Sequence, residues 1–180
     1  MIDLRQPTLP SALLVDGRAY EVRTSFRVWI EFERALREER MAWRGVFAGE
    51  QPEGAAWVEA AKEFLRSPNS TPRAERRDGP REVDLVEDGE LITAAFQQAY
   101  GIDLTATDMH WHRFKALLAG IPDDTRLAQV MGIRGYRKPP SKQDADAEAR
   151  KRQREWALRD PGYDEARADV LKWAEETFGD

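Results

Sequence analysis

The sequence predicts a mainly α-helical fold: a compact helical domain that opens with a small β-hairpin and ends in a charged helical hairpin or arm. Apolar residues recur with the 3.6-residue period of an amphipathic helix in several segments, whereas only one short stretch carries a hairpin signal. Hydrophobic residues make up 41% of the 180 residues, and six Trp, seven Phe and four Tyr are among them. The chain can therefore bury a core of its own.

The first expected element is a β-hairpin over residues 12–22. Asp16-Gly17 stands there between two short apolar runs. A two-residue type I′ turn needs positive φ at both positions, and Asp-Gly meets this need. The hairpin should therefore open the fold.

Two helices should follow the hairpin. The first begins at Thr24 or Ser25, either of which can cap it, and extends to about Arg40. The second runs from about Pro52 to Leu65. Their apolar faces carry large side chains that we expect in the core, chiefly Phe26, Trp29, Phe32, Trp57 and Phe64.

The next segment, residues 67–83, holds three prolines, two serines and charges of mixed sign, with almost nothing apolar to bury. Such a composition is typical of a mobile loop. We count this loop within a helical core domain that spans residues 1–138.

Residues 84–136 are the most informative part of the chain. A helix from about Glu87 to Tyr100 should end at Gly101, because glycine adopts the left-handed conformation at low cost. A second helix should start near Thr107 or Asp108 and end at Gly120. A third, short helix can be capped by one of three residues and carries its own apolar positions: Asp123, Asp124 or Thr125 as caps, and Leu127, Val130 and Met131 on the stripe.

This block also carries a series of residues in a specific order and spacing: Asp88, Leu91-Ile92, Ala95-Phe96, Tyr100-Gly101-Ile102-Asp103-Leu104, Met109-His110-Trp111, Phe114, Leu117-Leu118, Gly120, Asp124-Thr125 and Ile133-Arg134. In these residues the chain resembles a phage and prophage tail protein family. This is the gene-product-fifteen type of long-tailed phages of Gram-positive hosts. The resemblance covers roughly 50 residues.

The resemblance implies a tail assembly chaperone. Such a protein is not an enzyme; it binds the tape measure protein in the host bacterial cytoplasm and keeps it soluble before the tail tube forms. The major tail protein and other copies of the chain are further candidate partners. The main alternative is a structural tail or neck (head–tail connector) protein that stays in the virion, and a less favoured one is a DNA-binding helix-turn-helix protein.

Composition narrows the function further. No run approaches the roughly 18 apolar residues that span a bilayer, and the N-terminus lacks a secretory pattern, so we expect no membrane association. The chain has no cysteine and a net charge of −5, which disfavours thiol chemistry and general nucleic-acid binding. It contains no nucleophile elbow, P-loop or dinucleotide glycine motif. We therefore expect no catalytic residue and no cofactor.

His110 and His112 form a His-x-His pair near two aspartates, which invites a metal interpretation. Two residues apart on a helix means about 200° around its axis, so the imidazoles should point to opposite faces. We expect His110 to pack near Phe114, His112 to be exposed, and no metal site. The acidic pairs Glu87-Asp88 and Asp123-Asp124 stand at helix starts, where they can cap free N–H groups, rather than forming an acid/base pair.

Residues 113–138 are locally basic, with six Lys or Arg against two Asp. Gly120-Ile121-Pro122 between two helices resembles a helix-turn-helix, and several polar and basic residues follow as candidate DNA contacts: Arg126, Gln129, Arg134, Arg137 and Lys138. The second helix is short and uses its apolar residues for packing. A structural corner is therefore the favoured interpretation.

The C-terminal region, residues 139–180, is highly charged. Its first helix, over residues 141–160, has a thin apolar stripe, and a last helix follows Asp160-Pro161-Gly162. The two either fold back as a hairpin or reach out to a partner. Trp156 serves as a partner contact or packs against the last helix through Trp173. The nominated partner contacts are Trp111, Arg134, Trp156 and Trp173.

Overall fold

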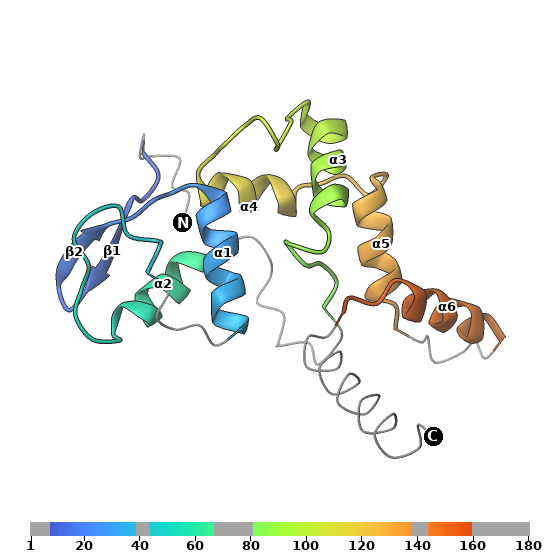
Figure 1. Ribbon diagram of the computed structural model, residues 1–180. Coiled ribbons are helices and arrows are strands. Elements are labelled where there is room, and N and C mark those ends of the chain that lie inside the picture. The colour runs from blue at the N-terminus through green and yellow to red at the C-terminus, as the bar shows by residue number, and fades with distance from the viewer. Residues whose placement is uncertain (1–7, 39–43, 67–80, 138–143, 160–180) are drawn as a thin grey trace, which may run out of the picture.

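The computed structural model describes residues 8–38, 44–66, 81–137 and 144–159. In chain order the elements of these residues are β1 (Ala12–Val15), β2 (Arg18–Glu21), α1 (Phe26–Arg37), α2 (Trp57–Leu65), α3 (Gly89–Tyr100), α4 (Trp111–Ala119), α5 (Arg126–Arg134) and α6 (Asp144–Glu155). The predicted fold class, mainly α-helical with a small N-terminal hairpin, is confirmed (Figure 1). Among the described residues, no helix has both the length and the apolar character to cross a membrane.

The N-terminal hairpin turns at the predicted place. Asp16 and Gly17 have φ of 49° and 80°, as a type I′ turn requires. β1 and β2 pair antiparallel, with Leu13 opposite Tyr20. Leu13 and Val15 are buried, because alternate side chains of β1 face the core next to α2.

α1 begins directly after Ser25, one of the two residues predicted at its start. The Ser25 hydroxyl does not cap the helix but donates to Asp108 at 2.8 Å. The Phe26 N–H donates to the Met109 carbonyl at 2.9 Å, and the Trp111 N–H donates to the Thr24 carbonyl at 2.7 Å. The beginnings of α1 and α4 are thus fastened together. α1 ends at Arg37, and Arg40 lies outside the described residues.

The core joins the two ends of the molecule through aromatic rings. α4 contacts both α1 and α3 and lies between the hairpin end and the α3–α5–α6 end (Figure 1). Phe114 of α4 stacks on Phe26 at 4.7 Å and on Phe96 at 5.3 Å between ring centroids. Trp29 stacks on Phe64 at 4.2 Å. All five rings are buried, as their positions on the apolar stripes predicted.

The start of α2 corrects the prediction. The helix begins at Trp57 and not near Pro52. Gly54 has a φ of 67°, which a right-handed helix cannot contain. The Arg44 guanidinium donates to the Pro52 carbonyl at 2.5 Å and to the Gly54 carbonyl at 2.9 Å. Residues 52–56 therefore form a loop before α2 and are not part of the helix.

The central helices end where local chemistry predicted. Gly101 is left-handed, with a φ of 66°, and its N–H donates to the Gln97 carbonyl at 3.0 Å. Of the three candidate caps before α5, Thr125 takes the position, and its hydroxyl accepts from the Ala128 N–H at 3.2 Å. α4 is followed by Gly120, as predicted.

Two helix starts in this block differ from the prediction. α4 begins at Trp111 and not near Thr107 or Asp108, because the Asp108 carboxylate accepts from Ser25 and His110 serves as the cap. α3 begins at Gly89, two residues later than expected. Asp88 occupies the cap position of α3 but does not cap the helix, because its carboxylate accepts from Arg134.

α6 lies against α5 (Figure 1). It covers part of the predicted helix over residues 141–160, and the last predicted helix with Trp173 lies outside the described residues. Residues 67–80 of the predicted mobile loop also lie outside them. Residues 81–83, at the end of the predicted loop, contain no helix or strand, and there Arg81 pairs with Asp84 and the Glu82 carbonyl accepts from Arg134.

Candidate functional site

A buried ion pair joins three segments at the α5–α6 end of the molecule. Nη1 and Nη2 of Arg134 donate to the two carboxylate oxygens of Asp88 at 2.6 and 2.9 Å. The two side chains are only 6% and 3% exposed. Arg134 Nε also donates to the Trp156 carbonyl at 2.6 Å, and Nη1 donates to the Glu82 carbonyl at 3.1 Å. A bidentate arrangement of this kind fixes the start of α3, the end of α5 and the residue after α6 in one geometry.

A second buried carboxylate, that of Asp84, extends this network toward α1. Its Oδ1 accepts from the N–H groups of Val86 and Glu87, and its Oδ2 accepts from the guanidinium groups of Arg37 and Arg81. Burial by itself would raise the pKa of Asp84. The hydrogen bonds from the Glu87 N–H, Arg37 and the Val86 N–H outweigh burial and lower the pKa to about 2. Asp84 is therefore ionised at neutral pH and holds α1 to the segment before α3.

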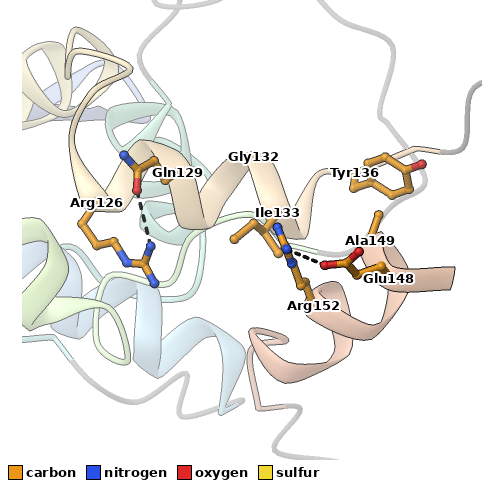
Figure 2. A pocket seen from close by; sticks show the side chains of 8 residues that line it. All are labelled: Arg126, Gln129, Gly132, Ile133, Tyr136, Glu148, Ala149 and Arg152. Carbon is orange, nitrogen blue, oxygen red and sulfur yellow. Dashed lines mark hydrogen bonds and ion pairs between the residues drawn. The ribbon is translucent and has the colours of Figure 1, made fainter. Parts of the chain in front are cut away.

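An open groove of about 580 Å³ runs between α5 and α6 (Figure 2). Gly132 and the half-buried Ile133, Tyr136 and Ala149 provide its apolar surface. The remaining lining residues are polar or charged: Arg126, Gln129, Glu148 and Arg152. α5 supplies one long side of the groove, because residues three or four apart share a helix face.

The two arginines of the groove are placed differently. Arg152 pairs with Glu148 of its own helix at 2.5 Å, so its charge is balanced within the groove. The Arg126 guanidinium lies over the Trp156 ring at 4.8 Å and donates to the Gln129 amide oxygen at 3.4 Å. In the part of the chain that the structure describes, no carboxylate pairs with Arg126. One end of the groove therefore carries a positive charge that no described carboxylate balances.

The histidine pair is not arranged as the sequence predicted. His112 is 2% exposed and not on the surface. The rings of His110 and His112 lie side by side, with centroids 5.1 Å apart, and do not point to opposite faces. His110 is the cap residue, with an extended backbone at φ −61° and ψ 137°, so the rotation of 100° per helical residue does not apply to it. Its Nδ1 accepts from the His112 N–H at 3.0 Å.

Both imidazoles are held in neutral forms. His112 Nε2 lies 2.9 Å from the Phe64 carbonyl, an acceptor, so this nitrogen carries the hydrogen. Burial lowers the pKa of His112 to about 4, although the Phe64 carbonyl acts in the opposite direction. Burial also lowers the pKa of His110. Among the described residues, no group of three or more His, Asp or Glu is placed to hold a metal ion.

The four nominated partner contacts are placed very differently. Trp111 is 2% exposed and packs on Phe114, and Arg134 belongs to the buried ion pair. We do not retain these two as surface contacts, because a partner would have to open the fold to reach them. Trp156 is half-buried at the Arg126 end of the groove, and Trp173 lies outside the described residues.

The structure also bears on the helix-turn-helix alternative. Leu127 and Val130 are fully buried, as the structural corner required. Arg134 cannot contact phosphate from its buried position, and Arg126 and Gln129 line the groove beside α6. The groove itself was missed by the sequence analysis. The one available signal was Gly132, a glycine inside a predicted helix.

Comparison with known protein families gives a match. The profile of a family described as Bacteriophage Gp15 protein matches residues 55–158, more than half of the chain. The chain belongs to this family, which confirms the gene-product-fifteen resemblance seen in residues 84–136, without indicating the type of host. The matched span includes helices α2 to α6 and therefore the ion pair and the groove, whereas the hairpin and α1 precede it. No curated protein and no solved structure matches the chain. In general terms, the family suggests a structural or head–tail protein of a bacteriophage.

Proposed function

We propose that this protein is a tail assembly chaperone, which binds the tape measure protein in the host cytoplasm and keeps it soluble during tail morphogenesis. The observation that supports this most is the open groove between α5 and α6, which lies within the family-matched span. Its apolar surface and charged ends suit the binding of a helix from another protein. No motif in the sequence points to an enzyme.

The mechanism would be the shielding of apolar surface. A long helical client exposes apolar stripes along its length, and such stripes drive aggregation when they are uncovered. A small protein with one groove covers one stretch of such a stripe. Several copies would therefore bind along one client and leave it when the tail tube replaces them.

Co-expression with the tape measure protein of the same phage tests this function. The tape measure protein should be largely insoluble alone and soluble with this chain. The two should co-purify, with more than one copy of this chain per client by native mass spectrometry. If the tape measure protein stays insoluble and no complex forms, the chaperone function is wrong.

The alternative is a structural tail or neck protein, which the general character of the family favours. Quantitative mass spectrometry of purified particles distinguishes the two. A structural protein is present in a fixed number of copies per particle, whereas a chaperone is absent from finished particles. The same experiment can be followed by pull-down with the major tail protein, the next candidate partner.

A further inference from the structure

We propose that the α5–α6 groove binds a client helix that makes its closest approach at Gly132 and carries a carboxylate that pairs with Arg126. This inference rests on the proposed function, since the client is the tape measure protein. It specifies the chemistry of the bound segment: an apolar stripe with an acidic residue beside it. Gly132 and Arg126 support it independently.

Gly132 lies inside a nine-residue helix, where glycine costs about 1 kcal/mol relative to alanine. Within the residues that the structure describes, neither backbone conformation nor packing accounts for this glycine. Its φ is not in the left-handed region, and a Cβ built there would meet none of the described atoms within 4 Å. Gly135 offers a contrast, because a Cβ there would lie 2.8 Å from Glu82 Oε1. Gly132 lines the groove, so its missing side chain leaves the α5 backbone exposed to a bound partner there.

Arg126 supplies the electrostatic part of the inference. It lies six residues before Gly132, about 9 Å along the axis of α5 at 1.5 Å per residue. Its guanidinium rests on the Trp156 ring and, among the described residues, pairs with no carboxylate. A client carboxylate between one and two helical turns from the point of closest approach would supply the counter-charge. The half-buried Ile133 and Tyr136 would pack against the client's apolar stripe.

A substitution that fills the groove tests the point of closest approach. Gly132→Gln adds a long, neutral, helix-favouring side chain where there is open space, so the melting temperature should stay equal or rise. Gly89→Gln is the matched control, because Gly89 is also helical with open space around its Cβ and lies outside the groove lining. We expect Gly132→Gln to weaken binding of the purified tape measure protein at least tenfold and Gly89→Gln to change it less than twofold.

A charge reversal tests the carboxylate. Arg126→Glu should weaken the complex at least tenfold, and the loss should shrink as salt concentration rises. Arg113→Glu makes the same charge change on the exposed face of α4 and should change binding less than twofold. Circular dichroism of each variant establishes that it is folded. If Arg126→Glu proves unstable, Arg126→Gln removes the charge with less disturbance and should weaken binding in the same direction.

The outcomes separate this inference from the proposed function. If the wild-type chain does not bind the tape measure protein, the function is wrong and the inference falls with it. If the wild-type chain binds and the Gly132→Gln variant binds equally well, only the groove assignment is wrong. If Gly132→Gln abolishes self-association instead, or duplex DNA competes with the client for the groove, the occupant is a second copy or a nucleic acid, and the inference is overturned.

Discussion

Arg134 directs each of its three guanidinium nitrogens at an acceptor within the fold. The sequence presented it as a basic residue at the end of a short helix, which is typical of a surface position. Its partner Asp88 is 46 residues away. No local pattern encodes a pairing at that separation, and so a residue nominated for binding turned out to hold the fold together.

We expect Arg134→Met to lower the free energy of unfolding by about 3–5 kcal/mol, because it leaves the Asp88 carboxylate buried without its partner. The double variant Asp88→Asn/Arg134→Met should recover a large part of this loss, since no unpaired charge then remains. Urea denaturation followed by circular dichroism measures both. Equal stability of the single and double variants would show that an unpaired carboxylate is not the cause.

Among the elements, the helix ends divide into those that local chemistry decides and those that distant contacts decide. The left-handed Gly101 and the capping Thr125 were predictable, because each acts on its own helix. Asp108 and Asp88 were expected at helix starts for the same reason. Instead, the Asp108 carboxylate accepts from Ser25 and the Asp88 carboxylate accepts from Arg134, in each case a residue distant in the sequence. The groove was unpredictable for a related reason: it exists only because α6 packs on α5.

His112, near the start of α4, should make the free energy of unfolding depend on pH. The pKa of His112 is about 4 in the folded protein, against an ordinary value of 6.5. Between these two values the unfolded chain binds the proton and the folded protein resists it. The contribution of the neutral His112 to the free energy of unfolding is therefore complete above pH 6.5. It is lost as the pH falls toward 4, by up to roughly 1 kcal/mol per pH unit.

Urea midpoints of the wild type and of His112→Gln between pH 7 and pH 4 measure this effect. The variant should lose less stability on acidification than the wild type, because it has one titrating group fewer. Asp84 does not interfere, since its lowered pKa places its own loss of stabilisation below about pH 3.8. Parallel curves for the two proteins would show that His112 titrates alike in the folded and unfolded states.

For the molecule as a whole, the boundary predicted at residue 138 separates α6 from the helix that it packs on. Besides the Trp156 carbonyl bound by Arg134, the Gln153 amide donates to the carbonyls of Arg134 and Tyr136 at 2.6 and 3.2 Å. The family match also continues through residue 158. We therefore propose that α6 forms one structural unit with α5.

Two truncations test this. A chain ending at residue 143 should be at least ~1 kcal/mol less stable than the full chain, because Arg134 loses an acceptor and α5 loses its cover. A chain ending at residue 159 keeps these contacts and should be more stable than the chain ending at residue 143. Thermal unfolding by circular dichroism compares them. Equal stability of the two truncations would show that α6 contributes nothing to the fold.

The fastening of α1 to α4 has a consequence for synthesis on the ribosome. Ser25 bonds to Asp108, which is translated 83 residues later. At about 5–20 residues per second, this takes on the order of 4–17 s. During that interval Phe26 lacks the Phe114 ring on which it stacks in the finished protein. The nascent N-terminal segment therefore lacks part of its aromatic packing until α4 has emerged, and slow synthesis should lower the yield of folded protein.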